Sequence, residues 1–549
     1  MKHKWKGTAF VFTAMLLGAS TQALAATPET IMKSTASTTT SEVKLPAGAE
    51  KVVATLEKLE PGFKVLTKRS VEVVERYENL VRLYMEKPDD EYSNATVYFD
   101  RKTGELISLE VSINNGNKGK TEKATDEVIL QRAETFVQEL LGADKRKLTG
   151  APQLYQAEED NNPDAPLDED AVYRLIYYPA LLNGLKLDES DFGIRVVTDY
   201  AGHLVELTFN PIDLKGASVP DPKKALSPAA IQKQIFTPDR LDYGYIGEGK
   251  DGKPTLEYIL RTSPVFDAIS GKQIDGQRGT QIEDGKRNAT NHKNVTIKPQ
   301  AKPLIANSAE EAEKIVVNLF GVDTKKAYSH YKKEEYGDNI AHYWTEEYQD
   351  RFASLTVDKS TGQVSMANNW TITEEIPVPL TEEQAMQKAI AFIEPYVEAA
   401  DWQVEIIEPE KDAPLADWMI KLYEEEGTDV ESSNGLYGFS FKQLHHGVPI
   451  IDNYYWVMVD VATGHVVRME TSLPIKDRTY PVLKPTVTEQ QAAEILGKNI
   501  PLELSYTWTT FYGERAPYLT LVYTLDTSKG WPYVDAISGS FQWSEYEEE

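Results

Sequence analysis

The chain contains no cysteine, and this absence sets the first limits on its chemistry. Without thiols it can form neither disulfide bonds nor thiolate metal sites. Its 549 residues must therefore be stabilised by buried apolar cores, and a chain of this length is long enough to build them.

Basic residues are also scarce relative to acidic ones. The chain has 58 Lys and Arg against 86 Asp and Glu, which gives a formal net charge of −28. Such an acidic surface repels nucleic acid and anionic wall polymers unless cations intervene, so we expect no nucleic-acid partner. Because no apolar run approaches the ~20 residues that cross a bilayer, we expect no transmembrane segment in the mature chain.

Recognisable catalytic motifs are missing as well. None of the eight histidines is followed by glutamate, as a His-Glu-x-x-His zinc site requires, and no Gly-x-Ser-x-Gly sequence occurs. We therefore expect no catalytic residue, no cofactor and no enzymatic activity. Glycoside hydrolysis needs only two suitably spaced carboxylates, and among 86 acids this alternative stays open. His203 and His465 each follow a turn glycine, where an exposed strand position is expected.

One acidic segment resembles the first half of a calcium-binding loop. Asp160, Asn162 and Asp164 have the right spacing, but Ala165 replaces the turn glycine and Ala171 the closing glutamate. A solvated loop is the default interpretation of such a charge run, with weak calcium binding as the alternative.

The first 25 residues have the features of a secretory signal peptide. Lys2, Lys4 and Lys6 give a positive start, an apolar stretch covers 9–18, and an Ala-Leu-Ala cleavage site ends at Ala25. We therefore expect cleavage near Ala25 and a protein that is secreted or loosely associated with the cell wall. Because this segment holds three lysines and no acid, its removal takes the net charge from −28 to −31.

One feature recurs six times: an aspartate is followed three or four residues later by a glycine, between alternating apolar residues. Asp accepts backbone N–H bonds from residues just ahead, and Gly supplies the positive φ at which the next strand departs. The pattern therefore predicts structural β-hairpin turns rather than acidic sites. The pairs are Asp100 and Gly104, Asp199 and Gly202, Asp267 and Gly271, Asp358 and Gly362, Asp460 and Gly464, and Asp535 and Gly539. The second pair is one residue closer, which predicts a tighter turn.

A short amphipathic helix precedes each hairpin, and most of these helices have start signals. Thr125 is a predicted N-cap, as is Ser227 with Pro228 at the first helical position. The helix after Thr125 is expected to bury Ile129, Ala133, Phe136, Val137 and Leu140. Capping-box spacing is present at Ser308 with Glu311, Thr381 with Gln384, and Thr488 with Gln491. The start near residue 47 has the weakest signal.

Helix and strands together define six modules, and their lengths run short, long, short, then short, long, short again. We infer that a block of three modules was duplicated in tandem. The predicted modules cover 47–113, 125–211 and 226–277, then 307–370, 380–472 and 487–544. The predicted parts are a signal peptide (1–25), a flexible leader (26–44), a first half (45–280), a linker (281–300) and a second half (301–549).

The fold class predicted for these modules is α+β, with a helix packed on one face of a small antiparallel sheet. Modules of ~50–90 residues are marginal alone. We therefore expect neighbours within a half to share sheets or to pack their helices together.

A family resemblance is strongest in the second and fifth modules, and residues 446–464 of the fifth carry its motif. There His446-Gly-Val-Pro-Ile450 precedes the strand and turn Val-Met-Val-Asp460-Val-Ala-Thr-Gly464. This string resembles PepSY-type modules, and the module pattern of the mature chain resembles the YcdB/YcdC repeat family of Gram-positive bacteria. The resemblance implies a cystatin-like helix on a sheet for each module. PepSY modules in propeptides of secreted metallopeptidases are thought to restrain or chaperone the protease. The resemblance carries over no catalytic residue.

These observations predict an exported, non-catalytic, protein-binding repeat protein. The expected partner is a secreted or envelope protein, with a protease as one candidate. Edge strands of small antiparallel sheets offer a route, because a partner's extended segment can be added to them. Two alternatives stay open: a cell-wall or polysaccharide-associated hydrolase with an unrecognised carboxylate pair, and a purely structural envelope protein.

Overall fold

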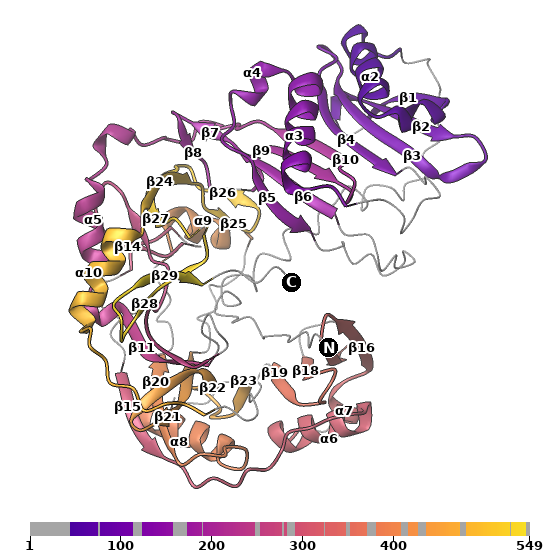
Figure 1. The fold of residues 1–549 in the computed structure, drawn as a ribbon. Helices are drawn as coiled ribbons and strands as arrows, with labels where there is room; N and C mark the ends of the chain where they lie inside the picture. The colour runs from indigo at the N-terminus through magenta and orange to yellow at the C-terminus, as the bar shows by residue number, and fades with distance from the viewer. Residues whose placement is uncertain are drawn as a thin grey trace. The chain divides into compact units, whose positions relative to one another are not determined.

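The computed structural model describes residues 44–74, 77–112, 123–157, 173–188, 190–247, 253–276, 279–282, 291–322, 324–346, 352–370, 380–407, 415–426, 435–472, 479–527 and 529–544. Their chain course is drawn in Figure 1. The described residues form two compact units. Unit 1 comprises 226–503 and 523–544, and unit 2 comprises 44–225 and 504–522. The predicted signal peptide and the Asp160–Asp164 loop lie outside the described residues.

Unit 2 contains an eight-stranded sheet in the order β1-β2-β3-β4-β10-β9-β6-β5, and all its pairs are antiparallel. β4 and β10 pair through Leu109 and Leu207, so the predicted modules 47–113 and 125–211 share one sheet, as expected. The bounds are β1 Lys68–Val74, β2 Tyr77–Lys87, β3 Asp90–Asp100, β4 Leu106–Ser112, β5 Gln153–Ala157, β6 Tyr173–Pro179, β9 Gly193–Thr198 and β10 Leu204–Asn210.

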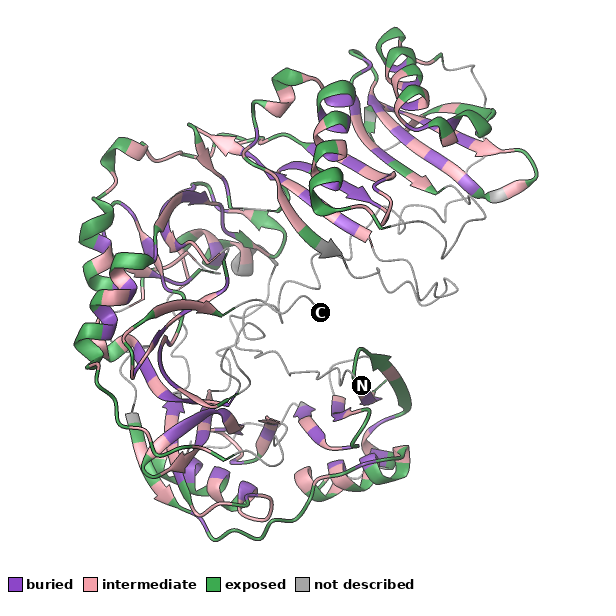
Figure 2. Cartoon of the chain, in the orientation of Figure 1, coloured by how far each residue is buried: buried purple, intermediate pink, exposed green. Residues whose placement is uncertain are grey.

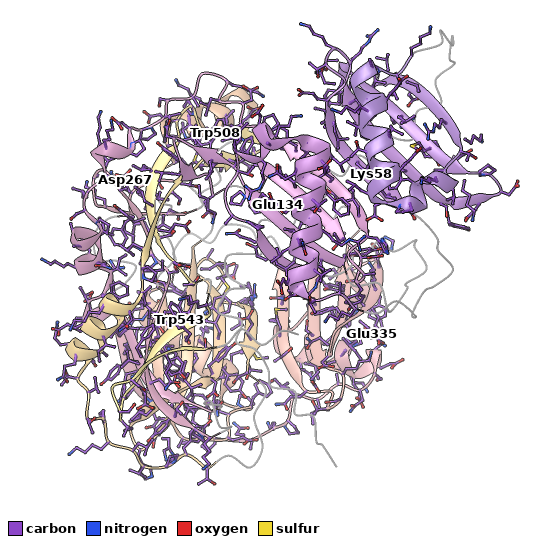
Figure 3. All side chains as sticks on the ribbon, turned by 45° about the horizontal axis from the view of Figure 1, so that its top comes forward. Lys58, Glu134, Asp267, Glu335, Trp508 and Trp543 are labelled. Atoms are coloured by element: carbon purple, nitrogen blue, oxygen red, sulfur yellow. The ribbon has the colours of Figure 1, made fainter. Side chains whose placement is uncertain are left out.

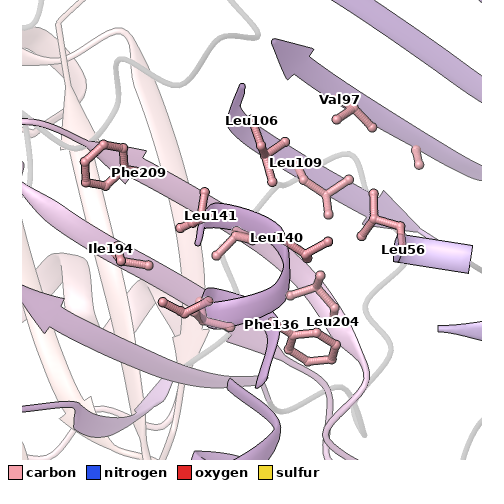
Figure 4. Close-up of a cluster of buried hydrophobic side chains, with 14 of the residues drawn as sticks. Leu56, Val97, Leu106, Leu109, Phe136, Leu140, Leu141, Ile194, Leu204 and Phe209 are labelled. Atoms are coloured by element: carbon pink, nitrogen blue, oxygen red, sulfur yellow. The ribbon is translucent and has the colours of Figure 1, made fainter. Parts of the chain in front are cut away.

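Helices α2 (Ala47–Leu59) and α3 (Asp126–Phe136) supply apolar side chains to the core of this sheet, part of which is shown in Figure 4. Leu56 of α2, Phe136 of α3 and Leu109 of β4 are at most 2 % exposed. The core therefore joins both helices to the shared sheet. Shorter elements of unit 2 are η2 Pro61–Val65, the π-helical turn η3 Val137–Leu141, α4 Ala143–Arg146, β7 Leu181–Leu182, β8 Leu185–Lys186, η4 Pro222–Lys224, β25 Thr510–Phe511 and β26 Glu514–Arg515.

Unit 1 contains a thirteen-stranded sheet. Its main path is β16-β17-β18-β19-β23-β22-β11-β12-β28-β29, and a branch from β22 runs through β21 and β20 to β15. The bounds are β11 Leu241–Ile246, β12 Thr255–Leu260, β15 Asn291–Thr296, β16 His330–Tyr336, β17 Asn339–Thr345, β18 Phe352–Asp358, β19 Val364–Trp370, β20 Asp401–Ile407, β21 Leu436–His445, β22 Val448–Asp460, β23 Val466–Thr471, β28 Trp531–Asp535 and β29 Phe541–Ser544.

The junction of β11 with β22 is parallel, whereas the other pairs of this sheet with an assigned register are antiparallel. Tyr245 is opposite Ile450 at this junction. A Cβ at Gly244 would lie 2.5 Å from the carbonyl oxygen of Pro449. Glycine at this position is therefore what lets β11 approach β22 closely.

Helices α6 (Ala309–Phe320) and α8 (Glu382–Ile393) contribute to the core of this sheet. Val316 of α6, Ala389 of α8 and Phe439 of β21 are fully buried together, and the burial of the described chain is coloured in Figure 2. The fold is therefore α+β, with helices packed against largely antiparallel sheets. Other helices of unit 1 are α5 Pro228–Ile235, η5 Pro238–Arg240, α7 Thr324–Ala327, α9 Asp417–Glu426 and α10 Glu489–Asn499.

A smaller sheet has the order β14-β13-β27-β24, and the division between the units falls within β24 and β27. The bounds are β13 Val265–Asp267, β14 Gln273–Ile274, β24 Leu502–Thr507 and β27 Thr520–Leu525. No helix in the described part of the chain is long and apolar enough to cross a membrane.

The helix start signals correspond closely to the structure. Thr125, Ser227, Ser308, Thr381 and Thr488 are all N-caps. The last two form complete capping boxes. Two details differ: the Ser227 side chain makes no cap bond, and the Glu311 carboxylate accepts from the N–H of Asn307 instead of Ser308. The start of α2 follows Pro46 and also has no side-chain cap bond, which agrees with its weak signal.

The prediction of a linker over 281–300 is wrong in part, because residues 291–296 form strand β15. This strand pairs with β20, and Lys293 is opposite Val404. Among the described strands β15 pairs only with β20, and its described side chains alternate between exposed and half-buried, so the segment lacks the apolar residues by which strands are recognised. The compact units also divide near Ala225, because β11 and β12 join the thirteen-stranded sheet. The two tandem halves remain a prediction about the origin of the chain.

Candidate functional site

In all six Asp-to-Gly turns, the aspartate Oδ1 accepts hydrogen bonds from backbone N–H groups of its own turn. At Asp358 the donors are Ser360 and Thr361, at 3.0 and 2.7 Å. The other four turns of this length have the same two donor positions, and the shorter turn at Asp199 uses Ala201 and His203. These bonds direct the carboxylates to the turn backbone. Asp267 is labelled in Figure 3.

The six turn glycines all have positive φ, between 68° and 80°. In five turns the glycine N–H donates to the aspartate carbonyl four residues earlier, and in the Asp199 turn the separation is three, as expected for the tighter loop. Each glycine also lies against the helix of its own module or the segment that leads into it. A Cβ at Gly362, for example, would lie 2.4 Å from Oδ1 of Asn307. Space as well as φ therefore requires glycine here.

A further contact joins each of four turns to the start of its helix. The carbonyl that follows the turn aspartate accepts the N–H of the residue before the helix N-cap. The donor and acceptor residues are Ala124 and Tyr200, Leu226 and Ala268, Leu380 and Val461, and Val487 and Ala536, at 2.7 to 3.2 Å. In these four modules, the turn is thus hydrogen-bonded to the start of the helix and connects the sheet to it.

A buried ionic network in unit 1 carries four charges that the sequence did not reveal. The Lys442 ammonium on β21 lies 3.0 Å from Asp242 on β11 and 3.5 Å from Glu405 on β20. Arg261 lies 3.0 Å from Asp242 on its other side. Burial opposes ionisation of Asp242, but the charges of Lys442 and Arg261 outweigh it and hold its pKa below the ordinary value. Paired charges of this kind fix β11 to β20 and β21, which is a structural role.

His203 is not the plain surface residue that the sequence predicted. Its Nδ1 lies 2.9 Å from the buried carboxylate of Glu60, which also accepts from the N–H of Leu204 and from Arg132. The hydrogen bond with Glu60 raises the pKa of His203, although burial partly opposes it. This cluster joins the end of α2 to β10 within unit 2. Among the described residues, no group of three or more His, Asp or Glu side chains can hold a metal ion.

One carboxylate pair has the chemistry that the hydrolase alternative would need. Glu257 on β12 is opposite Asp535 on β28, and Glu257 is 5 % exposed. Burial raises the pKa of Glu257 to about 7, a hydrogen bond from Thr255 opposes the shift, and the charges of Asp535 and Asp452 add to it. However, Asp535 Oδ1 is already occupied by N–H groups of its own turn. The pair is therefore poorly placed to act on a substrate.

Strand β16 has the most accessible free edge next to a pocket. It pairs with β17 along its whole length, from His330 opposite Thr345 to Tyr336 opposite Asn339. In the described part of the chain no strand pairs with its other side, and six of its seven residues are exposed (Figure 2). Glu335, labelled in Figure 3, pairs with Lys333 at 2.7 Å, so the charges along the strand largely neutralise one another.

A pocket of about 250 Å³ opens at the start of this strand. Its aromatic walls are Tyr331 on β16, Trp344 on β17 and Tyr328. Its polar walls come from the first turns of α6 and from α7, and include Glu310, Glu313, Thr324 and Lys325. A second pocket, of about 380 Å³, lies by β15 and the β21–β22 turn and is lined mainly by polar groups. Of these two pockets, only the first combines a free strand edge with aromatic walls. Pockets lined by aromatic side chains are common sites at which a partner's side chain binds.

The fold and the site define the class of this protein: it is an α+β protein with a free strand edge beside a pocket. Residues 309–472 match the family described as YcdB, YcdC repeated domain. Residues 309–472 thus correspond to a YcdB/YcdC repeated domain, and for this segment the resemblance seen in the sequence is confirmed. Both β16 and its pocket lie inside the matched segment.

Two solved structures show low similarity to the chain. The Bacillus megaterium YpeB C-terminal domain is 14 % identical, with a TM-score of 0.25, over 43 % of this chain and 96 % of the other. A protein from Eubacterium rectale ATCC 33656 is 8 % identical, with a TM-score of 0.25, over 57 % and 99 %. These scores are too low to assign a fold or a function. No curated protein sequence matches the chain.

Proposed function

We propose that this protein is an exported, non-catalytic binding protein that adds an extended segment of a partner protein to strand β16. The free edge of β16 is the single observation that carries this proposal. An exposed row of backbone N–H and C=O groups gains hydrogen bonds when an extended segment pairs with it. The seven residues of β16 are long enough for a ladder, and the pocket beside Tyr331 offers a place for one partner side chain.

The acidic character of the chain favours basic partners. A net charge of −28 speeds the approach of a positively charged segment and repels acidic ones. A secreted or envelope protein that follows the same export route is the proposed source of this segment, and a protease is one candidate. Two tandem three-module halves, each module built on a PepSY-like helix and sheet, are part of the same proposal. The recurring contacts between turns and helix starts support it.

The test uses two neighbouring proline substitutions on β16. In an antiparallel strand adjacent N–H groups point to opposite sides, so one of Lys332→Pro and Lys333→Pro removes a bond to β17 and the other removes a donor from the free edge. Peptides selected from a displayed random twelve-residue library on the wild-type protein are then tested against both variants. We expect the variant that keeps the wild-type melting temperature to lose peptide binding at least tenfold.

Two outcomes oppose the proposal. Undiminished binding to the thermally stable proline variant would place the peptide site away from the edge of β16. Failure of the library to yield any binding peptide would leave the free edge without a ligand and would refute the proposal.

The hydrolase alternative would depend on Glu257, whose pKa burial raises to about 7, although its neighbour Asp535 is occupied by its own turn. It predicts release of soluble sugar from cell-wall polysaccharide by the purified protein. It also predicts loss of that activity in Glu257→Gln.

A further inference from the structure

The pocket at the start of β16 has an aromatic wall that is held rigidly. The rings of Tyr331 and Trp344 are 5.6 Å apart at 47°, and Trp344 is buried while Tyr331 is 45 % exposed. The Tyr331 hydroxyl lies 2.8 Å from Nδ1 of His342, whose ring stacks on both aromatic neighbours. A ring fixed at two points presents a preformed face to a ligand, which reduces the entropy lost on binding.

Two carboxylates also line this pocket. Glu313 is fixed by the Thr324 hydroxyl, which donates to its Oε1 at 2.5 Å. Glu310 is exposed, and hydrogen bonds from its own backbone N–H and from Ser308 lower its pKa, so it remains ionised at neutral pH. Lys325 also lines the pocket and opposes a cationic guest. Two acids against one base leave the site negative.

Elsewhere in the chain, aromatic rings and a carboxylate also surround an arginine side chain. In unit 2 the Arg515 guanidinium lies 4.5 Å from the ring centroid of Phe192 and 5.0 Å from that of Trp508, and it contacts Asp191 at 2.6 Å. Trp508 is labelled in Figure 3. Aromatic faces and a carboxylate are thus the surroundings in which this protein holds a guanidinium.

We propose that the pocket formed by Tyr331, Trp344, Glu310 and Glu313 binds an arginine side chain of the partner segment. This inference rests on the proposed pairing of that segment with β16, and it adds a specificity to that pairing. A guanidinium stacks on an aromatic face and also donates hydrogen bonds, in its own plane, to carboxylates. A lysine ammonium is not planar, so it cannot combine stacking with such in-plane hydrogen bonds. The pocket lies at the His330 end of β16, so the arginine is placed at one end of the paired segment.

The probes that test the pocket are single amino-acid derivatives, because these need no strand pairing. Acetyl-arginine methylamide, its lysine counterpart and its uncharged citrulline counterpart are titrated onto the full-length mature protein and followed by NMR. We expect the arginine probe to bind at least tenfold more tightly than the citrulline probe, and more tightly than the lysine probe. Binding is expected to weaken at least fivefold in Tyr331→Ala and in Glu313→Gln.

Two further variants separate the pocket from a general effect of charge or of aromatic surface. Lys325→Gln removes the opposing charge and is expected to tighten arginine binding about two- to fivefold. Tyr336→Ala is the matched control, because Tyr336 is 43 % exposed at the other end of the same strand. It is expected to leave binding of the arginine probe unchanged.

Equal binding of the arginine and citrulline probes would overturn the inference, as would arginine binding that Tyr331→Ala and Glu313→Gln both leave intact. Neither result bears on the pairing of peptides with β16, which the proline variants test separately. Refutation of arginine binding in the pocket can therefore be distinguished from refutation of strand pairing.

Discussion

Glu257 should make the stability of unit 1 fall as the pH rises. This residue is 5 % exposed and is opposite Asp535 on the neighbouring strand. Burial raises its pKa from 4.5 to about 7, and the charges of Asp535 and Asp452 contribute to the shift. Each pKa unit corresponds to about 1.4 kcal/mol, so the ionised carboxylate costs the folded state about 3 kcal/mol.

The direction with pH follows from the two pKa values. Below pH 4.5 the carboxyl is protonated in both the folded and the unfolded chain and imposes no penalty. Between pH 4.5 and about 7 only the folded chain keeps the proton, so the free energy of unfolding falls as the pH rises. Above pH 7 the penalty is complete.

The substitution Glu257→Gln removes the charge and keeps the shape of the side chain. At pH 8 we expect the variant to melt higher than the wild type, on the order of 5 °C for about 3 kcal/mol. At pH 4.5 the gain should be absent. The measurement is differential scanning calorimetry at both pH values, with Glu398→Gln as a control that removes an exposed charge from the same unit. A Glu257→Gln variant that melts below the wild type at pH 8 would refute this account of the buried pair.

Three further predictions concern the stability contributed by contacts between helices and strands. In unit 2, His203→Gln should lower stability by under about 1 kcal/mol below pH 6.5, and the difference should vanish as the pH rises through the elevated pKa of His203; a difference that grows with pH in calorimetry would contradict the bond with Glu60. Gly362→Ala should destabilise by at least about 1–2 kcal/mol and by clearly more than Gly337→Ala, which has positive φ but open space; equal melting temperatures would show that space is irrelevant. Lys442→Met should cost about 3–5 kcal/mol in chemical unfolding because it leaves Arg261 as the single cation beside the buried carboxylates of Asp242 and Glu405, and a loss below about 1 kcal/mol would argue against a tightly packed network.

The elements that the sequence predicted well are those set by neighbouring residues. A side-chain cap such as Thr381 with Gln384 involves groups three positions apart, so the sequence shows both partners at once. The same holds for the Asp and Gly of each turn. The helix after Thr125 likewise buries Ile129, Ala133 and Phe136 as its period indicated.

The features that the sequence did not predict depend on contacts between distant segments. Lys442 is about 200 positions from Asp242, and nothing in either local sequence indicates the other. The sequence predicts a linker at β15 because this edge strand has few of the apolar residues that indicate a strand. The pocket beside β16 joins two helices to two strands, so its lining residues come together only in the folded chain. The best available signal was Tyr331 next to exposed lysines, which is too common a pattern to identify a site.

The central claim is that the free edge of β16 binds an extended partner segment. Amide hydrogen exchange followed by NMR, with and without a library-selected peptide, tests it most directly. Because only alternate N–H groups of β16 point to the free edge, the account predicts strong new protection at every second amide of His330–Tyr336 and little change at β1 or β29. Unchanged exchange along β16 while the peptide is bound would contradict it.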